Sequence, residues 1–101
     1  MRQHNPPHPG EFIREVYLDA LKDNISRSEI ARHLNVSRSA FNRLVTEKSD
    51  LTCEMAMRLS RVLGGTPESW LGMQSAYDLW HCKSIDMSMI KPLDTANYAE
   101  S

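Results

Sequence analysis

The stretch that decides the fold is "IARHLNVSRSAFNRL", which runs from Ile30 to Leu44. Two segments with apolar residues at helical spacing flank the short break Asn35-Val36-Ser37. Asn35 is of the non-glycine type that best tolerates a left-handed backbone, and Ser37 suits the N-cap of a new helix. Two short helices joined by about three residues are typical of a helix-turn-helix, which we predict for residues 26–46.

The side chains around the break fit the close crossing of two helices in such a motif. Ala31 is small enough to let the two helices approach, and Val36 can fill the core beneath the turn. Phe41 and Leu44 complete the contact from the following helix. A plain helical bundle with a short connection is the alternative interpretation of the same pattern.

An apolar stripe before the motif predicts a first helix from about Pro9 to Lys22. Pro9 suits the first turn of a helix, and Asn24 suits its stop. At the start of the next helix, Ser26 and Glu29 have the spacing of a capping box, in which each side chain bonds the backbone amide of the other residue. The predicted stripe of the first helix consists of Phe12, Ile13, Val16, Tyr17, Ala20 and Leu21.

Two further helices follow the motif, which gives an all-α chain of five helices. The fourth begins near Thr52 and ends at Gly64-Gly65. The fifth begins with Thr66 as N-cap and Pro67 at the first position, and it extends over about residues 66–82.

The fifth helix has more apolar surface than one face of a last helix usually buries. Leu71 and Leu79 lie off the main apolar line of the helix. We therefore expect one side to face the core and the other side to form the interface of a homodimer. The residues on the main line, predicted as the dimer interface, are Trp70, Met73, Tyr77 and Trp80.

The helices form one domain, residues 9–83, between two polar ends. Residues 1–8 are rich in Pro and His and are predicted to be a flexible arm. In the tail, residues 84–101, Ile85, Met87 and Met89 alternate with polar residues, which is the period of a strand. The tail is therefore either a β-strand that pairs with a second copy or a partner, or a disordered end.

Positive charge is concentrated in the middle of the chain. The whole chain has a net charge of −1, but residues 26–62 contain seven basic and four acidic residues. This distribution predicts one cationic face. A solvated helical surface is the alternative interpretation of charge alone.

The outer face of the third helix carries side chains that can contact DNA. When Phe41 points inward, the opposite face presents Asn42 and Thr46. In the major groove, Arg pairs bidentately with guanine and Asn with adenine, and short serines permit close approach. The start of the second helix and the loop after the third are predicted to contact phosphates. The predicted DNA-binding residues are Arg27, Ser37, Arg38, Ser39, Asn42, Arg43 and Lys48.

Composition and motifs argue against several other classes of protein. The chain has no apolar run long enough to cross a membrane and no signal-peptide core, so we expect a cytoplasmic protein. Cys53 and Cys82 are expected to be free thiols. His4 and His8 lack further ligands at metal-binding spacing, and no nucleophile, zinc or phosphate-loop motif is present. We therefore predict neither enzyme activity nor a metal or other cofactor.

From about His8 to Lys83 the chain resembles the HigA-type antitoxins of the Xre helix-turn-helix family, which is related to the phage repressors. The blocks that carry the resemblance are "HPGEF" (8–12), "SEIARHLNVSRSAFNRL" (28–44), "EMAMRLSRVLG" (54–64) and "PESWLGMQSAYDLW" (67–80). The resemblance implies a five-helix, lambda-repressor-like domain that dimerises through its C-terminal part. It also implies binding to a palindromic operator in the protein's own promoter, and neutralisation of a HigB-type toxin that cleaves mRNA.

Two positions depart from the pattern of that family. Asn35 stands where the turn commonly has Gly, and Thr46-Glu47-Lys48 stands where the next loop commonly reads "NGK". Glu47 places an acid near the expected phosphates. Two alternatives therefore stay open: a stand-alone repressor of the Xre family without a toxin, and a protein-interaction module that no longer reads DNA.

Overall fold

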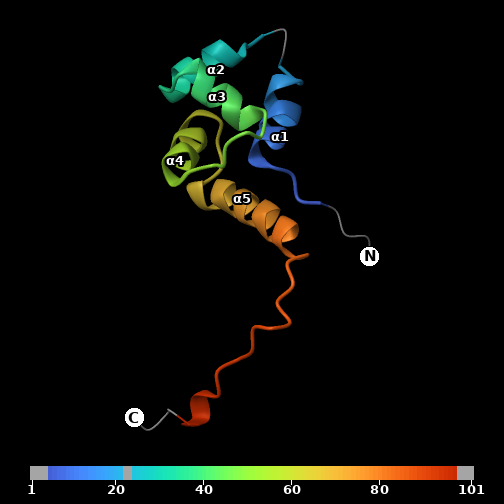
Figure 1. The fold of residues 1–101 in the computed structure, drawn as a ribbon. Coiled ribbons are helices and arrows are strands. Elements are labelled where there is room, and N and C mark those ends of the chain that lie inside the picture. The colour runs from blue at the N-terminus through green and yellow to red at the C-terminus, as the bar shows by residue number, and fades with distance from the viewer. Residues whose placement is uncertain (1–4, 22–23, 98–101) are drawn as a thin grey trace.

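The computed structural model describes residues 5–21 and 24–97 of the chain. Those residues form five α-helices and no strand, which confirms the predicted all-α class. Figure 1 shows α1 to α4 grouped on one side of α5, with a tail that leaves the domain after α5. In chain order the elements are α1 (Pro9–Ile13), the π-helix η1 (Arg14–Leu18), α2 (Arg27–Leu34), α3 (Arg38–Val45), α4 (Cys53–Val62), α5 (Pro67–Cys82) and the 3-10 helix η2 (Thr95–Asn97).

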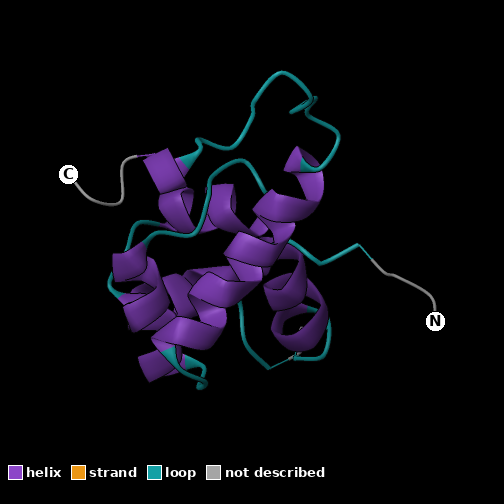
Figure 2. Cartoon of the chain, turned by 90° about the horizontal axis from the view of Figure 1, so that it is seen from below, coloured by secondary structure: helices purple, strands orange, loops and turns teal. Residues whose placement is uncertain are grey.

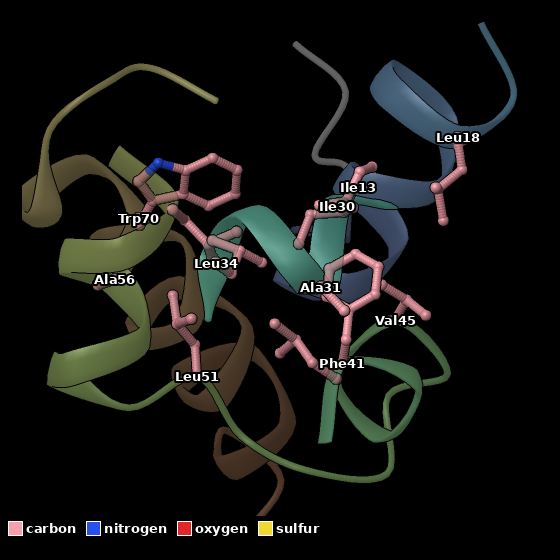
Figure 3. Close-up of a cluster of buried hydrophobic side chains, with 12 residues drawn as sticks. Ile13, Leu18, Ile30, Ala31, Leu34, Phe41, Val45, Leu51, Ala56 and Trp70 are labelled. Atoms are coloured by element: carbon pink, nitrogen blue, oxygen red, sulfur yellow. The ribbon is translucent and has the colours of Figure 1, made fainter. Parts of the chain in front are cut away.

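One hydrophobic core joins all five α-helices, and the view from below in Figure 2 shows them packed against one another. Ile13 from α1, Phe41 from α3 and Leu59 from α4 have no exposed surface. Removal of such side chains from water is the main stabilising contribution to the fold. The buried cluster, drawn in Figure 3, consists of Ile13, Leu18, Ile30, Ala31, Leu34, Phe41, Leu44, Val45, Leu51, Ala56, Leu59 and Trp70.

The helix-turn-helix has the predicted local geometry. Asn35 adopts φ 59° and ψ 45°, so the turn uses a left-handed residue as expected. Ser37 caps α3, because its hydroxyl accepts a hydrogen bond of 3.0 Å from the amide of Ala40. The predicted capping box at α2 is only half formed: Ser26 accepts from the amide of Glu29, whereas the Glu29 carboxylate lies 3.6 Å from Arg32.

The predicted first helix is not a regular α-helix. After α1 the chain widens into η1, where the amide of Asp19 donates to the carbonyl of Arg14 five residues earlier, at 2.7 Å. The extra residue in this turn rotates the following side chains. Leu18 is therefore buried, whereas three residues of the predicted stripe, Val16, Ala20 and Leu21, are exposed.

The domain begins earlier than predicted. His8, placed in the flexible arm by its sequence, is only 2% exposed and caps α1 through a 2.9 Å bond from the amide of Gly10 to its Nδ1. Its ring also packs edge-on against Tyr77 of α5. The prediction that the flexible arm includes His8 is therefore wrong. Residues 1–4 of the predicted arm lie outside the described residues.

The described part of the tail is exposed over residues 84–96 and forms no strand over residues 84–97. Residues 84–90 make turns in which the amides of Ile85 and Ile90 donate to the carbonyls of Cys82 and Met87. The alternating apolar residues are solvated here, with Met89 85% exposed. The strand was predicted to pair with a second copy or a partner, so this part of the prediction stays open.

Candidate nucleic-acid interface

A concave, cationic surface lies between the start of α2, the outer side of α3 and the loop that follows α3. The surface brings together six of the seven predicted DNA-binding residues. Its lining consists of Arg27, Arg38, Ser39, Asn42, Arg43, Thr46 and Lys48.

With its volume of about 530 Å³, this surface is a groove in which positive charge is concentrated. Four of its side chains are cationic, and no acidic side chain lines it. Among the described residues, the ion pairs are Arg14–Glu47, Arg32–Glu29 and Arg58–Glu54, so the cations of the groove are not neutralised by a carboxylate. Three arginines and a lysine on one face, without a carboxylate in an ion pair with them among the described residues, suit the binding of a polyanion.

Two side-chain contacts organise the groove. The guanidinium of Arg27 donates to Oδ1 of Asn42 at 3.5 Å, which links the start of α2 to α3. The guanidinium of Arg43 donates to the hydroxyl of Ser39 at 3.4 Å, one turn away on α3. Both bonds are long and therefore weak. They hold the side chains near the surface and leave the amide nitrogen of Asn42 available as a donor.

Ser37 is the predicted contact residue that does not line the groove. Its oxygen accepts the bond from Ala40 that caps α3. The hydroxyl hydrogen is still available as a donor, because an N-cap uses the oxygen only as an acceptor.

Thr46 lines the groove although it was not among the predicted contact residues. Helical spacing places Thr46 on the outer face of α3, and this spacing could have identified it as a contact residue. Its hydroxyl donates to the carbonyl of Asn42 at 2.6 Å, so it also secures the last turn of α3.

The loop after α3 brings Lys48 back to the groove. Glu47 has a positive φ of 64°, and the amide of Lys48 donates to the carbonyl of Arg43 at 2.8 Å. The Glu47 carboxylate lies 2.9 Å from the guanidinium of Arg14, outside the lining of the groove. The acid expected near the phosphates therefore has a cationic partner.

Two supporting residues had no signal in the sequence. Arg58 of α4 donates to the carbonyl of Leu34 at 2.8 Å, at the C-terminal end of α2, and pairs with Glu54. Gln74 of α5 is buried and accepts a 2.7 Å bond from the amide of Leu51, in the connection between α3 and α4. Both contacts join segments more than 20 residues apart, and therefore fix the frame that carries α3.

The predicted dimer residues of α5 do not share one environment. Trp70 is 3% exposed, its indole donates to the carbonyl of Gly64 at 2.9 Å, and its ring packs against Phe12. Trp70 is thus a core residue and is not available to a second copy. Met73, Tyr77 and Trp80 remain partly exposed.

Beside them, Leu79 is 69% exposed, although it lies off the main apolar line. One face of the Trp80 ring is covered by the ammonium of Lys83, 3.2 Å from the ring centroid. The accessible apolar surface of α5 therefore lies toward its C-terminal half.

The described segments, 5–21 and 24–97, contain neither a cluster of metal ligands nor a helix suited to span a membrane. Within them, no group of three or more His, Cys, Asp or Glu side chains could hold a metal ion. None of their helices has the length and hydropathy that a membrane span requires.

Comparisons with known proteins give relatives in both sequence and structure, while no protein-family profile matches the chain. The chain is 42% identical over 96 residues to the HTH-type transcriptional regulator YddM of Escherichia coli strain K12, which covers 94% of this chain and 99% of that relative. The structure of the antitoxin GraA in complex with its operator superposes with a TM-score of 0.78 and 31% identity, over 92% of this chain and 96% of the other. The Pseudomonas aeruginosa antitoxin HigA with the higBA promoter gives 0.74 and 33%, over 87% and 98%.

Proposed function

Because the chain belongs to the family of helix-turn-helix transcriptional regulators that includes the HigA antitoxins, we propose that it is a repressor that binds operator DNA through α3. The observation that carries the proposal is the groove, where six predicted contact residues lie together without an acidic neighbour in the lining. Relatives of the same fold are antitoxins in complex with an operator or a promoter.

In the proposed mechanism α3 enters the major groove of B-DNA. Arg38 and Arg43 pair with guanines, and Asn42 pairs with an adenine through its amide. In the free protein Asn42 Oδ1 accepts a hydrogen bond from Arg27. When Asn42 binds the adenine, Arg27 releases this oxygen and turns toward a phosphate. Lys48 contacts a second phosphate. These phosphate contacts release counterions, so the affinity falls as salt rises.

We propose that the protein acts as a homodimer. One short helix reads only a few base pairs, and two-fold pairing places a second copy of α3 about 34 Å away, in the next major groove on the same side of the duplex. The accessible apolar side chains of α5, Met73, Tyr77, Leu79 and Trp80, are the proposed interface. Bound to a palindrome in its own promoter, the dimer blocks transcription.

The proposed second role is that of an antitoxin, whose partner is a HigB-type toxin that cleaves mRNA. It is supported by the antitoxin names of the structural relatives. A stand-alone repressor is the second candidate, because the relative YddM carries the name of a transcriptional regulator. Both candidates act on DNA in the cytoplasm, and neither needs enzyme activity.

Footprinting on the DNA upstream of the protein's own gene tests the repressor role. We expect two protected half-sites, with centres about one helical turn, ~34 Å, apart. Uniform cleavage along the whole fragment would contradict the proposal. Co-expression with the neighbouring gene then separates the two candidates: an antitoxin restores growth to cells that are arrested by its toxin, and a stand-alone repressor does not.

A further inference from the structure

We propose that Arg14 is a positioning residue for DNA binding, which neutralises Glu47 and so allows an acidic side chain to stand next to the phosphate contact Lys48. The inference rests on the proposed function and deepens it. It concerns a pair of residues that both lie outside the groove lining, and a contact that joins the first helical segment of the chain to the loop after α3.

The guanidinium of Arg14 has two partners at the C-terminal end of α3. Its Nη2 lies 2.9 Å from the Oε2 atom of Glu47, and its Nη1 donates to the carbonyl oxygen of Val45. The two side chains are 32% and 30% exposed, so water screens the pair less than it screens a fully exposed one. The guanidinium of Arg14 therefore holds both the last turn of α3 and the Glu47 carboxylate in place.

Glu47 occupies a backbone conformation that favours glycine. Its φ of 64° lies in the left-handed region, where a side chain is normally a disadvantage. This conformation reverses the chain, so that the amide of Lys48 reaches the carbonyl of Arg43 and Lys48 lines the groove. Glycine would make the same turn without placing a charge there.

An unpaired carboxylate at position 47 would act directly against the proposed binding. Phosphates are expected to approach Lys48, and Glu47 is the residue next to it in the chain. The negative charges of the phosphates and of the Glu47 carboxylate would therefore repel each other. Arg14 cancels this charge and holds the carboxylate toward η1. The expected role of Arg14 is thus electrostatic, in addition to its bond to Val45.

A double-mutant cycle on DNA affinity tests this role. We would measure binding to a duplex from upstream of the protein's own gene for wild type, Arg14→Ala, Glu47→Gln and Arg14→Ala/Glu47→Gln. Arg14→Ala should weaken binding by about tenfold, because it exposes the phosphates to an uncompensated carboxylate. Glu47→Gln alone should change the affinity by less than about threefold, and the double variant should return to within about threefold of wild type.

Salt provides a readout that a merely structural role would not move. Repulsion between Glu47 and phosphates is screened at high ionic strength, so the deficit of Arg14→Ala relative to wild type should shrink as salt rises. The comparison of Arg14→Ala with the double variant is the sharpest, since both lack the bond to Val45 and differ only in the charge at position 47. Circular dichroism confirms that each variant is folded, and Arg14→Met, which keeps the apolar stem, replaces Arg14→Ala if the latter unfolds.

The matched control is Arg61→Ala, which removes the same charge from an exposed position on α4 outside the groove. It should leave the affinity within about threefold of wild type. If wild type binds the duplex but the double variant stays as weak as Arg14→Ala, the inference is overturned and the proposed function stands. If wild type binds no DNA, both are overturned.

Discussion

The backbone of Gly10 lies so close to Leu44 that a Cβ on Gly10 would be 2.0 Å from the carbonyl oxygen of Leu44. The first turn of α1 is therefore packed directly against the end of α3. Glycine is needed here for close approach and not for a special backbone angle. The contact fixes where α3 ends, and so the position of the loop that carries Lys48.

Gly10→Ala should consequently destabilise the protein by about 2–3 kcal/mol, because backbone atoms cannot move aside as a flexible side chain can. Urea denaturation at a fixed protein concentration measures the change. The matched control is Gly72→Ala in α5, where an added Cβ meets nothing within 4 Å. That variant should gain about 0.5–1 kcal/mol from helix propensity. Equal effects at the two positions would contradict the packing argument.

The turn of the helix-turn-helix depends on the left-handed conformation of Asn35. Asn35→Gly should change the free energy of unfolding by less than about 0.5 kcal/mol, because glycine adopts this conformation without strain. Asn35→Val should cost about 1–2 kcal/mol, since a β-branched residue is strained there. Thermal denaturation of the two variants side by side provides the measurement. A variant with Val that is as stable as the one with Gly would show that the turn is not under this constraint.

Base contacts and phosphate contacts should respond differently to mutation. Arg38→Ala should cost about 1–3 kcal/mol of operator binding and relax the preference at one base position. Lys48→Ala should weaken binding to all sequences and reduce the slope of log K against log salt by about 1.

Competition with a set of single-base operator variants, repeated at several salt concentrations, distinguishes these effects. If Arg38→Ala retains full selectivity, the recognition face of α3 has been placed wrongly.

The dimer proposal predicts a strong effect of a charge on the accessible apolar surface of α5. Leu79→Glu should leave the single domain folded, because Leu79 is 69% exposed, and should shift the protein to a monomer in sedimentation. Operator binding should fall by at least about tenfold, since one half-site then binds alone.

Leu93→Glu is the matched control, because Leu93 is 70% exposed but lies in the tail. It should leave both the oligomeric state and the affinity unchanged. A dimer that survives Leu79→Glu would contradict the interface placed on α5.

The sequence was most informative where a local rule determines the structure. The cap at Ser37, the left-handed Asn35 and the outward face of α3 depend on residues within about one turn of each other, so spacing alone predicted them. The groove followed from these elements, because α2 and α3 are joined by a turn of few conformations.

The sequence was least informative where partners are distant. Spacing cannot show that Arg14 reaches Glu47 or that Gln74 accepts a hydrogen bond from the amide of Leu51. These bonds join residues that are far apart in the sequence and meet only in the folded chain. The π-helix η1 was not predicted for a different reason. The apolar pattern was interpreted with a fixed period of 3.6 residues, and one inserted residue changes which side chains face the core. His8 was misplaced because a histidine next to prolines gave no sign that its ring would be buried against Tyr77.

The most direct test of the central claim is the affinity of the wild-type protein for DNA from upstream of its own gene, compared with an unrelated duplex of equal length, at several salt concentrations. We predict binding to the upstream duplex that is at least about 10³-fold tighter than to the unrelated one, and that weakens steeply as salt rises. Equal and weak binding to both duplexes would contradict the account, and would leave the accessible surface of α5 as the place to look for a protein partner.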